Sequence, residues 1–271
     1  MTVSVMLVSV AGTLDLVGRS GWGITEKQIG RGGASKLRSL EMRKVQDKLS
    51  AIKDQDVFIV YEDDFHQGGF INGWLAYFAR KNRLVLANSY VGASTITQVT
   101  PLSEKGWNDS LLLTTYPAEW TAGSIEKDWC YSGIQCFRLF RNDWAFVFRI
   151  RNPNGLELHN GNMFFWLSGD DTRMKIFAGK KGILTFRANL IAGPSLDTTS
   201  TRNVFLKSPN GPQRNIRFDR QCTIELEIPV SQGLNEIQMA CTDHANVSRL
   251  SNGDPRPLLV YVGNFELLGL N

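Results

Sequence analysis

The sequence has few of the residues and motifs that mark common catalytic centres. Its 271 residues include three histidines and four cysteines. A Gly-x-Ser-x-Gly elbow, a His-Glu-x-x-His pair and a Cys-x-x-Cys pair are all missing, so the usual signatures of serine hydrolases, zinc peptidases and thiol redox sites are absent. The histidines, His66, His159 and His244, are too scattered in sequence to define a metal site. We therefore expect neither a metal nor a cofactor.

The excess of charge of one sign is also small. Thirty basic and twenty-six acidic residues leave a net charge of +4, whereas nucleic-acid-binding proteins usually gather Lys and Arg on one face or in one run. The 42% hydrophobic and 21% charged fractions are typical of a folded soluble protein of one large or two ordinary domains. We expect no nucleic-acid partner. The densest basic cluster suits the solvated face of a helix and consists of Lys36, Arg38, Arg43, Lys44 and Lys48.

The N-terminal segment lacks an apolar run long enough to span a bilayer. Met1–Val17 carries one charge, Asp15, but is shorter than the ~20 apolar residues that a span requires. A charged n-region and a small-residue cleavage site are missing too, so no signal peptide is expected. The segment suits either a buried strand or the end of a membrane segment from a longer chain. Gly18–Gly33 holds six glycines and no apolar period, which predicts a linker.

The four cysteines leave the redox compartment open. Cys130 and Cys136 are close enough in sequence to close a small loop, and Cys222 and Cys241 lie in successive predicted strands that a disulfide could bridge. An even number of cysteines near strand ends suits an oxidising compartment. Four buried free thiols in a cytosolic protein are equally consistent with these positions.

Residues 34–120 alternate between helical and strand patterns. Apolar residues recur every three to five positions over Ala34–Ile52, which predicts an amphipathic helix, and a second helical stretch covers Ile71–Lys81. Apolar runs predict buried strands at Asp56–Tyr61, Leu84–Ala87 and Leu111–Thr114. This order predicts a small α/β domain with a largely parallel sheet.

Beyond Trp129 the helical period disappears, and short runs separated by Asn, Gly and Pro replace it. In Thr223–Ile228 every second side chain is apolar, as in a strand with one face against a core. We therefore predict an antiparallel β-sandwich over residues 128–271, which makes the chain α+β overall. The predicted strands are Phe137–Phe140, Ala145–Ile150, Met163–Leu167, Arg173–Phe177, Ile183–Leu190, Asn203–Lys207, Asn215–Phe218, Thr223–Pro229, Asn235–Ala240 and Leu258–Leu267.

Two segments of this region resemble the last strands of jelly-roll, galactose-binding-like sandwiches. Pro229–Ile237 matches their P-x-x-x-G-x-N-x-I strand, and Asp254–Leu258 matches the D-x-R-x-L turn that leads into the closing strand. The resemblance implies that the predicted sandwich has this jelly-roll topology.

Other segments resemble the soluble extracytoplasmic region of bacterial multi-spanning membrane glycosyltransferases. Met163–Gly169, with Gly193–Ser195 after a later strand, is similar to the sandwich of that region. Trp74–Arg80 followed by Leu84–Asn88 resembles the α/β segment that precedes it. The resemblance implies a location in the periplasm or at the cell surface. It also implies an association with a membrane-embedded glycosyltransferase region, as a tethered part or a free-standing relative.

One candidate catalytic site follows the first predicted strand. Asp63, Asp64 and His66 lie where ligands bind in open α/β sheets, at the carboxyl end of a strand. Carboxylates beside a histidine can act as acid and base or bind a metal. The same residues also suit a polar loop in which Asp63 or Asp64 caps backbone amides, and no second acidic cluster completes a metal shell.

One candidate ligand-binding site is aromatic. Trp129 and Tyr131 flank Cys130 in a loop-like stretch, where exposed rings could stack on the apolar faces of sugars. Packing in a core is the alternative for this pair. Trp144 and Trp166 alternate with apolar neighbours and are expected in the core.

Three functions fit these patterns. The first is a non-catalytic carbohydrate-recognition or accessory module of a membrane glycosyltransferase, with carbohydrate as its ligand. The second is an enzyme that processes a glycan or a phosphate ester with Asp63, Asp64 and His66. The third is a structural or assembly protein, since jelly rolls also build capsids and filaments.

Overall fold

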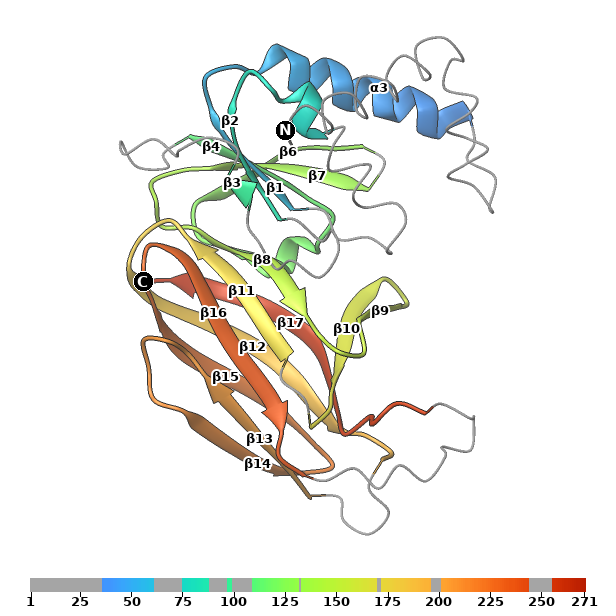
Figure 1. The fold of residues 1–271 in the computed structure, drawn as a ribbon, viewed down its shortest axis with the longest axis vertical. Helices are drawn as coiled ribbons and strands as arrows, with labels where there is room; N and C mark the ends of the chain where they lie inside the picture. The colour runs from blue at the N-terminus through green and yellow to red at the C-terminus, as the bar shows by residue number, and fades with distance from the viewer. Residues whose placement is uncertain are drawn as a thin grey trace, which may run out of the picture. The chain divides into compact units, whose positions relative to one another are not determined.

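The computed structural model describes residues 36–60, 75–87, 97–98, 109–131, 133–169, 172–195, 201–243 and 255–271 (Figure 1). The apolar segment Met1–Val17, with its two interpretations, and the predicted linker Gly18–Gly33 lie outside these residues. The chain divides into two compact units: the first includes Ser110–Thr115 and Lys127–Phe137, and the second includes Tyr116–Glu126 and Arg138–Asn271. No helix within the described ranges is long and apolar enough to cross a membrane.

The first unit joins one labelled helix to a mixed sheet, which we call sheet 1. Its elements are α3 (Lys36–Ala51), β1 (Asp56–Val60), β2 (Arg83–Leu86), β3 (Thr97–Gln98), β4 (Ser110–Thr114), β6 (Ile125–Tyr131) and β7 (Ile134–Leu139). The strand order is β3-β2-β1-β4-β7-β6. β1 pairs in parallel with β2 and β4, whereas β3 pairs antiparallel with β2. The sheet is therefore parallel at its centre and mixed as a whole.

The core of the first unit forms where α3 meets sheet 1. All residues of β1 are buried, as expected for a strand covered on both faces. Val45 and Leu49 of α3 are fully buried in one apolar cluster with Val57 and Ile59 of β1. The helix expected over 34–52 is present as α3, and its buried positions are those of the predicted apolar stripe.

The hairpin of β6 and β7 belongs to sheet 1, which places the boundary between the units later than predicted. The predicted sandwich begins at 128, and the run Phe137–Phe140 was expected to be one of its strands. In the structure Lys127–Phe137 lies in the first unit, with β7 next to β4. Trp129, Ile134 and Cys136 complete the same apolar cluster. The hairpin thus buries its apolar side chains in the first core.

The second unit is an antiparallel β-sandwich of two sheets. Its elements are η1 (Ala118–Trp120), β5 (Thr121–Ala122), β8 (Ala145–Arg151), β9 (Leu156–His159), β10 (Asn162–Leu167), β11 (Thr172–Ala178), β12 (Gly182–Ala192), β13 (Thr201–Lys207), β14 (Arg214–Asp219), β15 (Gln221–Val230), β16 (Gly233–Cys241) and β17 (Val260–Leu270). Sheet 2 has the order β15-β12-β17-β10-β9, and sheet 3 has the order β14-β13-β16-β11-β8-β5. Figure 1 shows the two sheets as stacked layers. The predicted β-sandwich is confirmed.

Each sheet of the sandwich buries one face and exposes the other. Along β12, Leu184, Phe186, Ala188 and Leu190 are buried, while the residues between them are not. β13 alternates in the same way. Period-two alternation follows from strand geometry, because successive side chains point to opposite faces of a sheet. The apolar sets of the two sheets meet in one core, and the polar sets form two outer faces.

The sequence motif Pro229–Ile237 forms the corner between the two sheets. Asn235 is buried, and its side-chain amide donates to the carbonyls of Ser231 and Gly233 at 2.8 and 3.0 Å. Its Oδ1 accepts from the backbone N–H of Ser231 at 2.8 Å. Gly233 has a φ of 94°, a region that favours glycine. The motif therefore fixes the turn that carries the chain from sheet 2 to sheet 3.

A buried arginine joins the other sequence motifs at one end of the sandwich. Arg202 is 2% exposed and donates to the carbonyls of Leu259 at 3.0 Å and Gly193 at 2.6 Å. An added β-carbon on Gly193 would lie 2.1 Å from the carbonyl oxygen of Leu258, so the close backbone approach requires glycine. Ser195 Oγ accepts from the Leu258 N–H at 2.8 Å. The segments after β12 and before β17 are thereby held together.

Candidate functional site

The aromatic pair predicted from the sequence does not form an open binding platform. Trp129 is 6% exposed and lies in the core of the first unit. It stacks on Tyr131 with a centroid distance of 5.4 Å, and Lys44 Nζ lies 5.3 Å from the centre of the Tyr131 ring. The expectation of an exposed Trp129 is corrected, because residues 125–131 form a strand whose apolar side chains point into the core. Trp129 is packed in the core, which was the alternative interpretation of this residue.

The predicted catalytic residues Asp63, Asp64 and His66 lie outside the described residues. Among the residues that the structure does describe, no group of three His, Cys, Asp or Glu side chains is placed to hold a metal ion. The candidate site is therefore built from the sandwich, where described polar and aromatic side chains converge on the outer face of sheet 2.

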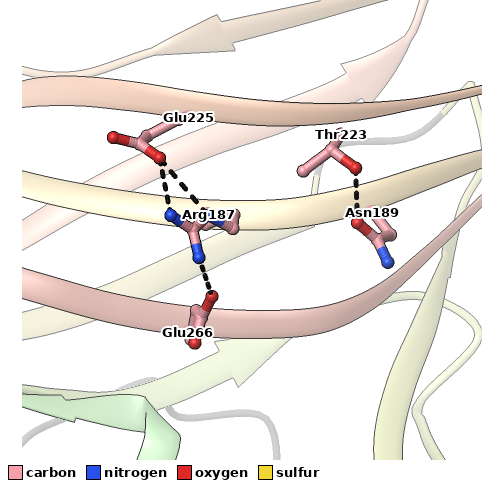
Figure 2. A network of polar contacts seen from close by, with 5 residues as sticks. All are labelled: Arg187, Asn189, Thr223, Glu225 and Glu266. Atoms are coloured by element: carbon pink, nitrogen blue, oxygen red, sulfur yellow. Dashed lines mark hydrogen bonds and ion pairs between the residues drawn. The ribbon is translucent and has the colours of Figure 1, made fainter.

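The first part of this site is a charged row across three strands. Arg187 of β12 lies between Glu225 of β15 and Glu266 of β17 (Figure 2). Its Nη2 donates to Glu225 Oε2 at 2.9 Å, and its Nη1 donates to Glu266 Oε1 at 2.9 Å. The hydrogen bonding of the guanidinium to Glu225 is the largest influence that raises the pKa of Arg187, with Glu266 adding to it and desolvation opposing it. The guanidinium is fixed in position between two carboxylates.

A bulge in β17 makes this row possible. The register between β12 and β17 shifts between Arg187 and Asn189, and Asn264 has a φ of 47°. Such an extra residue reverses which face the following side chains point to. Phe265 therefore points into the core, where it packs on Trp120 at 5.8 Å, and Glu266 points outward to Arg187.

The second part is a row of smaller polar groups beside the first. Asn189 is two positions from Arg187 on β12 and pairs with Thr223 of β15 and Gly263 of β17. Thr223 Oγ1 donates to Asn189 Oδ1 at 2.9 Å, which fixes the amide (Figure 2). Gly263 leaves a gap in this row, because it contributes no side chain.

The third part is an aromatic row. Tyr261 pairs with Ile191 of β12 and Trp166 of β10, and Tyr261 and Trp166 are both partly exposed. The two rings meet edge to face, with centroids 5.6 Å apart and an angle of 74°. The ring centroids of Phe164, also on β10, and Tyr261 are 4.8 Å apart. Tyr261 extends across the gap at Gly263, where an added β-carbon would lie 2.3 Å from its Cε1.

Sequence reasoning missed most of this face. Trp166 was expected in the core because its neighbours are apolar, but Phe165 and Leu167 point into the core, and Trp166 points the other way and is partly exposed. The period-two rule would have found this orientation. Trp144, also expected in the core, is buried there. Tyr261 stood in the predicted closing strand without any functional interpretation.

The cysteines are free thiols. Cys130 is exposed, Cys222 is half-buried, and Cys136 and Cys241 are buried. The two disulfides that the sequence left open, Cys130 with Cys136 and Cys222 with Cys241, are not formed in this structure. Cys241 donates to Asp243 Oδ2 at 3.2 Å, and burial raises its pKa to about 12. A thiol with so high a pKa is a poor nucleophile at neutral pH.

No family model matches the sequence, and no curated protein matches it either. Among solved structures, the chain is similar to a GH26-CBM35 β-(1,4)-mannanase from Podospora anserina, with 11% identity over 47% of this chain and 25% of that chain and a TM-score of 0.28. It is also similar to a family 35 carbohydrate-binding module from Clostridium thermocellum, with 10% identity over 45% of this chain and 91% of that chain and a TM-score of 0.29.

A third similar structure is the CBM35 from Cellvibrio japonicus Abf62, with 18% identity over 45% of this chain and 88% of that chain and a TM-score of 0.24. Each match covers under half of this chain, and the matched part of the Podospora enzyme is 25% of its length. Likenesses of this strength identify neither a family nor a ligand for this chain.

Proposed function

We propose that this chain is a non-catalytic carbohydrate-recognition module that binds a glycan on the outer face of sheet 2. The observation that carries the proposal is the Tyr261 ring, which lies across Gly263 with Trp166 beside it and borders two rows of polar side chains. Sugar rings have apolar C–H faces edged by hydroxyls. A partly exposed aromatic ring next to amide, carboxylate and guanidinium groups is complementary to both features.

The polar groups are held in place before any ligand arrives. Arg187 is fixed by two carboxylates, and Asn189 is fixed by Thr223. Ordering a free, rotamer-rich side chain on binding costs about 0.5–1.5 kcal/mol, so side chains that are already ordered favour affinity. All of these side chains stand on strands, which position them more precisely than loops do.

The charged row on sheet 2 is better suited to binding a glycan than to hydrolysing one. Glycosidases use two carboxyl groups on opposite sides of the scissile bond, with substrate between them. Here the space between Glu225 and Glu266 is occupied by the guanidinium of Arg187, which bonds both (Figure 2).

The proposal includes the setting that the sequence resemblance implies. In it, the chain is an accessory part of a membrane glycosyltransferase outside the cytoplasm, and the first unit is the small α/β domain before a jelly-roll sandwich. The parallel pairing of β1 with β2 and β4 supports the α/β description. Protease treatment of intact spheroplasts tests the location, because an extracytoplasmic chain is cut and a cytoplasmic chain is protected until lysis.

Affinity electrophoresis in gels that contain galactomannan, xylan or mixed-linkage β-glucan tests the binding site. We expect at least one polymer to retard the wild type, and Tyr261→Ala to weaken that binding by about 30-fold, as for a central aromatic contact. Tyr261→Phe keeps the ring and should stay within about threefold of the wild type.

Ile183→Ala is the matched control, because Ile183 is exposed on the outer face of the same sheet, outside the three rows. Equal retardation of the wild type and Tyr261→Ala, with both folded by circular dichroism, would remove the proposed site. A wild type that binds no polymer in these gels or on a glycan array would remove the proposed function.

A further inference from the structure

The outer face of sheet 3 concentrates positive charge. Outward positions on β8, β11, β13 and β14 are those that alternate with the buried residues of these strands. Six basic side chains occupy them, whereas the acidic side chains at outward positions of this sheet are Glu236 and Asp219, a balance of +4. We call this surface the basic face, and its basic residues are Arg149, Arg151, Arg173, Lys175, Lys207 and Arg217.

The opposite face of the sandwich has the opposite sign. On β15, β12 and β17 of sheet 2, the outward charged residues are Arg187 and the three acids Glu225, Glu227 and Glu266, a balance of −2. The two outer faces of the sandwich therefore carry net charges of opposite sign, which the net charge of +4 for the whole chain does not reveal.

Like charges stand directly opposite each other on the basic face. Arg173 pairs with Arg151, and Lys175 pairs with Arg149, across β11 and β8. Like charges directly opposite each other on neighbouring strands destabilise a sheet. Arg173 forms an ion pair with Glu236 at 3.3 Å, but its side chain remains 50% exposed. The fold thus tolerates an unfavourable concentration of charge at this surface.

Protection of a sheet edge does not explain the charges of β11. Lysines and other charges on edge strands prevent sheets from associating. Arg173 and Lys175 stand on β11, however, which pairs with β16 on one side and with β8 on the other. The pairing of β5 with β8 covers Ala145 and Phe146 and does not include Arg149 or Arg151. A surface on which basic side chains stand opposite one another suits an extended anion.

The side chains on the basic face indicate which class of anion it would bind. Arginine forks bind carboxylates through two parallel hydrogen bonds. Amide side chains lie among the basic groups, with Gln238 opposite both Arg173 and Lys207, and amides bind hydroxyls. A single-stranded nucleic acid requires successive exposed rings for its bases. The described outward aromatic residues of these strands include Phe205, which is half-buried, and Phe177 and Phe146, which are buried and stack on each other.

We propose that the basic face binds an acidic polysaccharide, with arginines on its carboxylates and amides on its hydroxyls. This surface is independent of the Tyr261 site, which lies on the other sheet. The test uses polygalacturonate as the probe and fully methyl-esterified polygalacturonate as its matched control, because esterification removes the charge and keeps the sugar. Retardation in gels that contain each polymer is measured at several salt concentrations.

We expect the wild type to bind polygalacturonate, to lose affinity as salt rises, and to ignore the ester. Arg151→Gln with Arg173→Gln should weaken binding at least tenfold. Lys180→Gln with Lys181→Gln removes the same charge from the turn before β12, outside the strands, and should stay within twofold. Lys207→Gln with Arg217→Gln is a second face variant in case the first does not fold. Tyr261→Ala should leave this binding unchanged, which separates this proposal from the previous one.

Three results would overturn the proposal. One is equal binding of the polymer and its ester, and another is an equal loss in the turn variant, which would indicate non-specific charge attraction. The third is tighter binding to a 20-mer oligodeoxynucleotide or to phosphatidylglycerol vesicles than to polygalacturonate, which would assign the face to nucleic acid or membrane.

Discussion

The ring of Tyr261 occupies the place that a side chain on Gly263 would take. A β-carbon on Gly263 would lie 2.3 Å from Cε1 and 2.4 Å from the phenol oxygen of Tyr261. The two residues are two positions apart on β17, so they share the outer face of sheet 2. Glycine at 263 therefore lets the ring lie against the sheet.

Gly263→Ala is expected to displace the ring and weaken glycan binding by about tenfold, since it removes part of a central aromatic contact. Stability should change by less than about 1 kcal/mol, because the displaced atoms are the end of a partly exposed side chain. Titration calorimetry and urea unfolding measure the two effects. Gly269→Ala on the same strand is the control, because its added β-carbon meets nothing within 4 Å. Unchanged affinity in Gly263→Ala would contradict the role of the ring's position.

Arg202→Met is expected to destabilise the second unit by about 3 kcal/mol. The substitution removes the side-chain donor to the buried Gly193 carbonyl and one of the two donors to the Leu259 carbonyl, which also accepts from the Gly193 N–H at 2.8 Å. Arg202→Lys should recover little of this loss, because an ammonium cannot reproduce the planar fork. Urea unfolding followed by tryptophan fluorescence measures both, with exposed Arg217→Met as the control. A loss below about 1 kcal/mol in Arg202→Met would show that the carbonyls find other partners.

The thiols should react in an order set by burial. Cys130 is exposed and should be labelled first by Ellman's reagent in the native protein. Cys222 should react more slowly, because burial raises its pKa, and Cys241 should resist labelling, because burial raises its pKa to about 12. Mass spectrometry after alkylation identifies each site. Labelling of Cys241 before Cys130 would be incompatible with the described packing.

The stability of the sandwich should fall in acid through Asp243. Burial opposes ionisation of this carboxyl, but hydrogen bonds from the side chain and backbone of Asn203 outweigh it, so the pKa of Asp243 lies below its ordinary value of 3.8. The unfolded chain therefore takes up a proton at a higher pH than the folded chain. This contribution is complete above the ordinary aspartate pKa and is lost as the pH falls through the folded pKa.

Urea midpoints between pH 6 and pH 2 measure this dependence. Asp243→Asn should be less stable than the wild type at pH 6 and should lose less stability on acidification. Glu227→Gln, which removes an exposed acid of β15 in sheet 2, serves as the control. Parallel curves for the wild type and Asp243→Asn would exclude Asp243 as the source.

Local pattern predicted most strands of the sandwich. Thr223–Ile228 alternates between polar and apolar residues, and β15 covers it with its apolar positions toward the core. β6 was missed because Glu126, Lys127 and Asp128 interrupt any alternation on an edge strand. The assignment of β7 to sheet 1 was missed for a different reason. Its position next to β4 is a long-range pairing that no local pattern contains.

The candidate site illustrates the same division. Glu225 and Glu266 lie 38 and 79 positions after Arg187 along the chain, yet the three residues form one row. Their meeting depends on strand order and on the bulge at Asn264, which turns Glu266 outward. Neither the strand order nor the bulge corresponds to a short motif in the sequence. The predicted Trp129 site was corrected for a related reason, because the stretch that looked like a loop is the edge strand β6, and it places the Trp129 ring in the core of the first unit.

The sequence by itself determined the succession of most strands and the sandwich beyond residue 138, because periodicity acts over a few neighbouring residues. Only the tertiary structure decided which strands are neighbours. That choice brought the aromatic and charged rows of sheet 2 together and collected scattered basic residues on sheet 3. The physical reason is that strand pairing and register are set by burial of the whole apolar set, which sums over the chain and cannot be read from any one segment.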